Sequence, residues 1–231
     1  MLLQRWRRVV FLHWPVPAGR IDAMLPQGLN VDTWEGDAWL TLTPFRVDGS
    51  RPALVPPIPG VSNFIESNVR TYVIGPDGRD GLWFFTLETN SLPTTIGANI
   101  SLGVPYRWAA AAEHSTGGRT TYHTRRRRAD PAPEQSVTID TSTRRSLADT
   151  QLTAWLTGRW RAWTTIGRRL AVVPVEHEPW PIRAGELVEQ HGTLLASLGL
   201  PAIPVAPIVQ WSPGVEARLG WPSLHGRADR S

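Results

Sequence analysis

Apolar and polar side chains alternate most clearly in two segments, 64–74 and 82–90. The stretch between them, GPDGRDG, is rich in the residues that form tight turns. We therefore predict that the two segments are strands of one β-hairpin. Alternation or short apolar runs predict further strands at 8–14 (ending at Pro15), 37–47, 119–128, 160–177 and 204–211.

Helical periodicity is weaker and predicts three short helices, at 18–25, 146–158 and 184–198. Proline-rich or polar stretches at 49–62 and 129–136 are predicted loops, and 223–231 a polar tail. The chain shows neither a repeat nor a linker. We expect one domain over 1–231 with a core at about 8–222. The element order favours an α+β fold, an antiparallel, barrel-like sheet with peripheral helices.

In the predicted hairpin, the alternate residues that share one face, here called one parity, are mostly polar. In the first strand it carries Glu66, Asn68 and Arg70, followed by Tyr72. If Tyr72 lies opposite Phe84, the polar residues face polar partners, because a one-residue slip would mix the two faces. That register pairs Arg70 with Thr86, Asn68 with Glu88, and Glu66 with Asn90.

The polar face lies either in solvent or along the wall of a polar cavity, and the hairpin residues leave both alternatives open. If it lines a cavity, Val69, Val73, Trp83, Phe85 and Leu87 pack on the opposite side, beneath a helix. Glu66 and Arg70 are about 13 Å apart along a strand, at roughly 3.3 Å per residue. They could therefore contact opposite ends of one ligand.

Composition narrows the chemistry. The 231 residues contain 24 arginines, no lysine and no cysteine. A Schiff base needs an amine that can lose its proton, which arginine cannot supply. The six histidines are dispersed, and Glu176, His177 and Glu178 would point to alternating faces of a strand, so we expect no metal and no cofactor. Nucleotide-cradle motifs are absent.

The net charge of +4 is modest. The apolar run at 9–12 is too short for a secretory signal, and no stretch approaches a membrane span, so we expect a cytoplasmic protein without a membrane partner. The run Arg125–Arg128 could bind phosphate or nucleic acid, but a solvated strand end is the favoured interpretation, so no nucleic-acid partner is expected. A homo-oligomer is left open.

Several segments together resemble the YqjF-like family, a domain of unknown function in the acetoacetate decarboxylase-like superfamily. They run nearly end to end: FLHWPVP (11–17), LPQGL (25–29), TPFR (43–46), FIESNVRTYV (64–73), WFFTLE (83–88), GVPY (103–106), VEHEPWPIR (175–183) and SPGV (212–215). The resemblance implies a barrel-like antiparallel sheet around a polar cavity. It therefore favours an interior position for the polar hairpin face.

The resemblance also implies a lost nucleophile. The decarboxylase relatives carry a lysine pair just before an L-G-x-P segment. Here that segment is 102–105, and Ile100 and Ser101 precede it. A cavity glutamate of those relatives matches Glu66. The resemblance thus implies that the cavity and one acidic residue, Glu66, are retained. Lysine-dependent decarboxylation is not expected.

Two functional hypotheses follow. In the first, an enzyme (a lyase, isomerase or hydrolase) acts on a small oxygenated or carboxylate ligand, with Glu66 or Glu88 as general acid/base. In the second, the cavity binds a small ligand without chemistry. In both, a small molecule is the partner, and the candidate ligand-binding residues are Arg70, Asn68, Asn90, Arg46, His13 and Tyr106.

The missing lysine gives a direct prediction. Incubation with acetoacetate or pyruvate followed by borohydride should leave no reduced adduct on any peptide from 64–106, because no primary amine stands there. Peptide mass spectrometry measures this. An adduct mapped to that segment would contradict the prediction.

Overall fold

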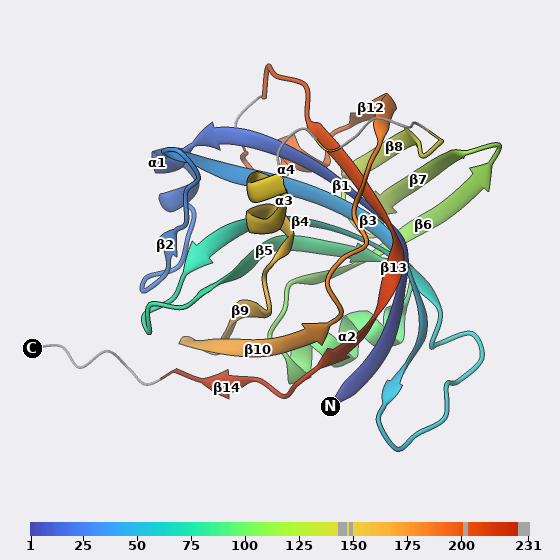
Figure 1. Cartoon of the computed structure of the whole chain (residues 1–231). Helices are drawn as coiled ribbons and strands as arrows, with labels where there is room; N and C mark the ends of the chain where they lie inside the picture. Colours follow the sequence, from blue (N-terminus) through green and yellow to red (C-terminus); the bar gives the residue numbers. More distant parts are fainter. Residues whose placement is uncertain (143–146, 148–149, 201–202, 226–231) are drawn as a thin grey trace, which may run out of the picture.

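The computed structural model describes residues 1–142, 147, 150–200 and 203–225. Strands dominate it (Figure 1). They are β1 (Leu2–Pro17), β2 (Asn30–Val31), β3 (Asp37–Pro52), β4 (Phe64–Ile74), β5 (Asp80–Thr89), β6 (Tyr106–Thr116), β7 (Arg119–Arg126), β8 (Glu134–Asp140), β9 (Arg161–Ile166), β10 (Arg169–His177), β11 (Arg183–Ala184), β12 (Glu186–Gly192), β13 (Ile208–Leu219) and β14 (Ser223–Leu224). The described helices are α1 (Ala18–Asp22), α2 (Leu92–Ser101), α3 (Thr150–Thr157) and α4 (Leu194–Ser197).

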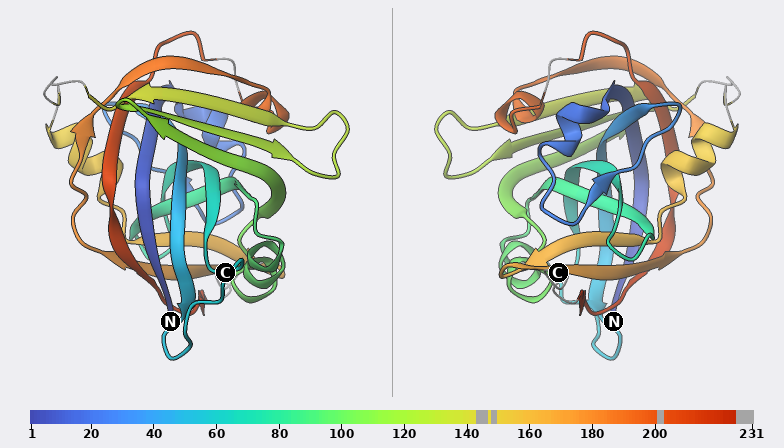
Figure 2. Two further views of the ribbon diagram at one scale, coloured as in Figure 1. Left: turned by 90° about the vertical axis from the view of Figure 1, so that its right-hand side faces the viewer. Right: turned by 90° about the vertical axis from the view of Figure 1, so that its left-hand side faces the viewer.

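Seven strands pair in a ring. The order β5-β9-β10-β13-β1-β3-β4 closes because β4 also pairs with β5. The long strands β13, β1 and β3 lie side by side along one wall (Figure 2). Most pairings are antiparallel, as expected, but β5 pairs in parallel with both β6 and β9. The sheet is therefore mixed, and β5 is the strand at which the ring joins the rest of the sheet.

A second layer extends from the ring. Strands β6, β7, β8 and β12 continue the sheet beyond β5. Tyr122 of β7 and Ile139 of β8 are buried against Leu12, Leu42 and Val69 of the ring. This layer covers the outer face of β1, β3 and β4, while their inner face looks into the ring.

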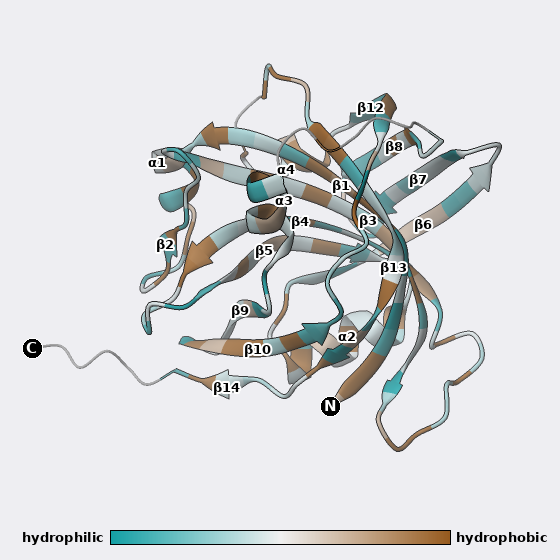
Figure 3. Cartoon of the chain, in the orientation of Figure 1, coloured by the Kyte–Doolittle hydropathy of each residue, from teal (hydrophilic) through white to brown (hydrophobic). Residues whose placement is uncertain are grey.

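The central strands are consequently buried on both faces. Phe64 to Val73 of β4 are all buried, and β1 is buried from Val9 to Trp14. Brown and teal residues nevertheless both occur along these interior strands in Figure 3, because polar side chains of the inner face line a cavity. On β4 the apolar parity enters the outer core, whereas the polar parity faces the interior of the ring.

Proline at a central strand position has a local explanation. Pro44 lies within β3, which pairs on both sides, yet proline has no N–H to donate. The pairing of β1 with β3 is interrupted between Arg7 and Leu12, opposite Leu42 to Arg46. Pro44 sits in that interruption, where β1 offers it no ladder partner. Arg8 takes a left-handed conformation, with φ 48°, at the same irregularity.

The structure corrects several sequence-based elements. The predicted helix 184–198 is instead β12, followed by the short α4, and Leu187 packs into the outer core while β12 pairs with β8. Its helix-favouring residues are overruled by this pairing. Helix α2 and strands β6 and β8 had no predicted counterpart. The predicted helix 146–158 is α3 from Thr150, and part of its beginning lies outside the described residues.

Two boundaries also differ from prediction. The polar tail was expected from 223, but Ser223 and Leu224 form β14 and pair with β10. Residues 226–231 lie outside the described residues. The predicted loop 49–62 begins later, because β3 continues to Pro52. None of the described helices has the length and apolar character needed to cross a membrane.

Candidate functional site

A cavity of about 90 Å³ lies inside the ring, between the inner faces of its strands and the end of α3. Its lining is mainly apolar, with a polar group concentrated on β4 and β3. The polar and charged lining residues are Gln4, Thr43, Glu66, Asn68, Arg70, Tyr106, Thr157, Arg159, Arg161 and His177. A volume of this size accommodates several water-sized groups, enough for a small organic molecule.

Glu66 is the acidic residue of this lining. It is 4% exposed, and its Oε2 accepts a hydrogen bond of 2.7 Å from the Tyr106 hydroxyl. Asn68 Nδ2 donates to Oε1 at 3.2 Å. Burial raises the pKa of the Glu66 carboxyl from 4.5 to about 7, although both hydrogen bonds and the charge of Arg70 oppose the change. Near neutral pH this carboxyl can therefore both accept and release a proton.

Arg70 supplies a buried cation near that acid. Its guanidinium lies over the Phe11 ring, 5.5 Å from the ring centroid. The described residues offer it no ion pair, and its Nε has no hydrogen-bond partner. Burial lowers the pKa of Arg70, while Tyr72 and Glu66 oppose that effect. An arginine remains charged even so, and a buried charge without an opposite charge beside it is costly.

Four unsatisfied polar atoms belong to residues of the cavity lining. Thr43 Oγ1, Asn68 Oδ1, Arg70 Nε and Arg159 Nε are buried and lack hydrogen-bond partners among the described residues. The first three lie on neighbouring strands. In the pairing of β3 with β4, Thr43 lies opposite Asn68, and Thr41 opposite Arg70. Buried polar atoms are rarely left without partners, so these four are the positions in the lining at which a hydrogen bond remains to be made.

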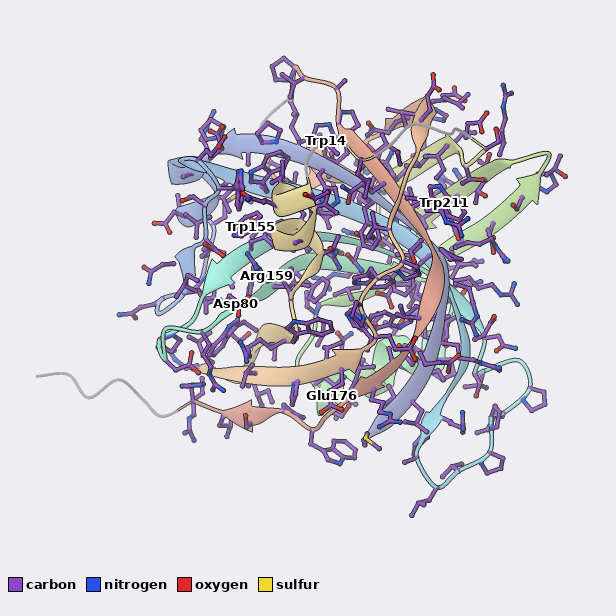
Figure 4. All side chains as sticks on the ribbon, in the orientation of Figure 1. Trp14, Asp80, Trp155, Arg159, Glu176 and Trp211 are labelled. Atoms are coloured by element: carbon purple, nitrogen blue, oxygen red, sulfur yellow. The ribbon has the colours of Figure 1, made fainter. Side chains whose placement is uncertain are left out.

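Two further arginines, Arg159 and Arg161, lie at the α3 end of the cavity. Arg159 contacts Asp32 at 2.8 Å and Asp80 at 3.1 Å, and its guanidinium lies over the Trp155 ring at 4.5 Å (Figure 4). Arg161 contacts Asp80 at 2.9 Å. Both of these cations are paired with carboxylates, whereas the described residues offer Arg70 no carboxylate partner.

His13 belongs to a polar network beside the cavity. It is fully buried, and its Nδ1 lies 2.9 Å from Thr41 Oγ1. The Tyr72 hydroxyl lies 2.8 Å from the same Oγ1 and donates to the Leu156 carbonyl at 2.9 Å. Burial, with help from the charge of Arg70, lowers the pKa of His13 to about 3, so the imidazole is neutral at physiological pH. His13 is absent from the cavity lining.

The predicted hairpin register is wrong along its whole length. Tyr72 pairs with Leu82 and Arg70 with Phe84, a shift of two residues that keeps the predicted parity. Val69 then pairs with Thr86, so Phe85 is an extra residue in a β-bulge. The bulge reverses the parity of the rest of β5. Leu87, expected on the far side, faces the cavity with Asn68.

Glu88 consequently faces away from Glu66. It pairs with Ser67 and is 1% exposed on the outer side of the ring, where Arg126 Nη2 donates to its Oε1 at 2.5 Å. This arrangement also corrects the interpretation of the arginine run as merely solvated. Arg126 neutralises a buried carboxylate, and the guanidinium of Arg127 stacks at 4.9 Å from the Trp108 ring centroid.

Of the remaining candidate residues, Tyr106 lines the cavity, and Asn90 and Arg46 do not. Asn90 lies outside the cavity, where its Oδ1 accepts from the Ile65 backbone N–H at 2.9 Å. Arg46 is half-exposed and contacts Asp48 at 2.7 Å. Tyr106 does line the cavity. Sequence reasoning missed Thr43 as a site residue, although its position in TPFR opposite the polar parity of β4 was the available signal.

The segment 102–105 reaches the cavity, but the two residues before it do not. Ile100 is 79% exposed and Ser101 is exposed, whereas Leu102 and Val104 line the cavity. Gly103 has φ 65°, and a Cβ there would meet the Thr165 carbonyl oxygen. Among the described residues, no group of three or more acidic or histidine side chains is placed to hold a metal ion.

Glu66 should make stability depend on pH. The pKa of Glu66 is higher in the folded state than in the unfolded state, so its protonated carboxyl favours folding at acidic pH. This contribution to the unfolding free energy is lost as the pH rises from 4.5 through about 7. Glu66→Gln removes this titration. Between about pH 4 and pH 8, the wild-type unfolding free energy should fall by about 3 kcal/mol more than that of the variant. Urea unfolding measures this, and parallel pH profiles would contradict it.

The variants Arg126→Gln and Arg125→Gln are to be compared, because they change neighbouring arginines with different surroundings. Arg126→Gln leaves Glu88 buried without its cation and should cost about 3–5 kcal/mol of unfolding free energy. Arg125→Gln should cost less than about 0.5 kcal/mol, because Arg125 is 63% exposed and 3.9 Å from Glu134. Urea unfolding of both variants measures the difference, and equal small effects would show that the Glu88 pair is dispensable.

Known proteins share this architecture. An acetoacetate decarboxylase-like enzyme from Sphingomonas wittichii RW1 matches with a TM-score of 0.68 at 15% identity, over 97% of this chain and 92% of that chain. Acetoacetate decarboxylase from Legionella pneumophila matches with a TM-score of 0.66 at 14% identity, over 97% and 87%. The enduracididine biosynthesis enzyme MppR complexed with pyruvate matches with a TM-score of 0.64 at 17% identity, over 97% and 90%. At these identities the likeness concerns the fold.

Sequence similarity gives the family. The chain is 29% identical over 222 residues to the uncharacterized protein YqjF of Bacillus subtilis (strain 168), covering 96% of this chain and 91% of YqjF. The family pattern described as "DUF2071: Uncharacterized conserved protein (COG2071)" matches residues 3–216. The chain therefore belongs to the DUF2071 family, on an acetoacetate decarboxylase-like fold.

Proposed function

We propose that this protein binds a small 2-oxo carboxylate in the ring cavity and that Glu66 exchanges a proton with it. The observation that carries the proposal is the pairing of an acid of raised pKa with an unpaired buried cation on one strand face. Arg70 binds the carboxylate, and Glu66, on the same face of β4, exchanges the proton with the bound acid. The ring of strands surrounds the bound acid and both groups.

The proton transfer has a defined balance. With pyruvate, the ionised Glu66 carboxylate takes a proton from the methyl carbon, the C–H electron pair forms the enolate C=C bond, and the carbonyl oxygen gains the negative charge. Arg70 and the unpaired Thr43 hydroxyl stabilise that charge. Return of a proton from Glu66 to that carbon regenerates the 2-oxo acid and leaves Glu66 ionised again. No lysine takes part, so the chemistry differs from Schiff-base decarboxylation.

The fold relatives support this choice of probe. MppR is known in complexes with pyruvate and with the condensation product of pyruvate and imidazole 4-carboxaldehyde. A pyruvate-sized acid fits the volume available here. Binding without chemistry is the second candidate function, favoured by the two hydrogen bonds that already hold both Glu66 oxygens.

Proton exchange distinguishes the two functions. In D₂O the protein should replace the methyl protons of pyruvate with deuterium faster than buffer alone. The rate should rise with pH through about 7, because only the ionised Glu66 accepts a proton. Proton NMR measures the loss of the methyl signal.

Three variants complete the experiment. Glu66→Gln should abolish catalysed exchange yet retain pyruvate binding in a thermal-shift assay. Arg70→Gln should lose binding, and Glu186→Gln, at an exposed position of β12, should behave as the wild type. Pyruvate binding without any wild-type exchange would favour the purely binding function. Exchange that persists in Glu66→Gln would overturn the role given to Glu66.

A further inference from the structure

One wall of the cavity is a continuous row of aromatic rings that begins at Arg70. Phe11 lies beneath the guanidinium, and the Phe11 and Trp180 ring centroids are 5.3 Å apart. Trp180 stacks on Trp6 at 5.8 Å with 14° between the rings, and lies 4.7 Å from His177. We call these four rings, Phe11, Trp180, Trp6 and His177, the aromatic row. All four line the cavity.

The aromatic row leads from the interior toward solvent. Phe11 is fully buried, whereas Trp6, His177 and Trp180 are half-buried. Beyond His177, the Trp160 ring lies 4.5 Å away and is 40% exposed. The polar group that binds the carboxylate thus stands at the closed end of a path whose side is aromatic. A ligand with its acid at Arg70 would extend its other end along these rings.

We propose that the preferred ligand is a 2-oxo acid with an uncharged, planar aromatic tail, bound with its carboxylate at Arg70 and its ring against Trp180 and Trp6. This inference rests on the proposed function, because it assigns the substrate class of the same cavity. Indole rings bury large apolar areas and favour stacked or edge-to-face contact with a planar group. A methyl tail, as in pyruvate, would leave most of the row uncovered.

The charges of the cavity decide against a cationic tail. Aromatic rings can also recognise cations, but Arg70, Arg159 and Arg161 all line this cavity, and Glu66 is the acidic residue of the lining. His177, within the row, has its pKa lowered by burial and by the charge of Arg70. Trp6 and Trp180 are nearly parallel and adjacent, which presents a surface to a planar group and does not enclose a cation.

Calorimetric titration of the whole chain with phenylpyruvate and with pyruvate tests the inference. The wild type should bind phenylpyruvate at least tenfold more tightly than pyruvate. Trp180→Ala should reduce this preference below threefold without changing the Kd for pyruvate. The control Trp221→Ala should retain the preference, because Trp221 is 70% exposed and outside the cavity lining.

The outcomes separate the two proposals. Equal affinities for the two acids, or equal weakening of both by Trp180→Ala, would overturn the aromatic tail while leaving pyruvate binding in place. Failure of both acids to bind would overturn the proposed function as well. Should Trp180→Ala not fold, Trp6→Leu tests the same preference. Tighter binding of trimethylglycine than of phenylpyruvate would show that the row binds a cation.

Discussion

Burial of β4 on both faces is the constraint on which the site depends. Its outer parity packs beneath β7 and β8, and its inner parity carries Glu66, Asn68 and Arg70 into the ring. Charged groups in such a place are costly unless they are paired or hydrogen-bonded. Glu66 meets the cost by two hydrogen bonds and a raised pKa, whereas Arg70 keeps its charge without a paired anion. In the proposed function, a ligand carboxylate is the missing partner of Arg70.

The two sides of the ring handle buried charge differently. Outside, Glu88 is neutralised directly by Arg126, and the pair joins β5 to β7. At the α3 end, Arg159 is held by Asp32 and Asp80. Each charge in these pairs has an opposite charge beside it, although Arg159 Nε has no hydrogen-bond partner among the described residues. Arg70 differs from them because the described residues give it no ion pair.

The aromatic row adds direction to the cavity. Its rings run from the buried cation to partly exposed tryptophans, so the cavity has a polar closed end and an apolar approach. A molecule bound there would be oriented by charge at one end and by stacking at the other. Such orientation would place the carbon on the far side of the carbonyl group near the Glu66 carboxyl, where proton transfer needs it.

The sequence by itself determined the existence of the hairpin, the polar parity of its first strand, and the exclusion of lysine chemistry. These follow from local alternation and from composition, which need no tertiary contacts. It also pointed to Tyr106 and Thr43 through family segments, although Thr43 was not chosen as a site residue. Only the tertiary structure decided which face of β5 meets Glu66, because one extra residue, Phe85, reverses the parity and no turn residue marks it. It likewise decided that 186–192 is a strand, since pairing with β8 outweighs helix propensity. Long-range partners such as Arg126 for Glu88 depend on strand order, which local patterns do not encode.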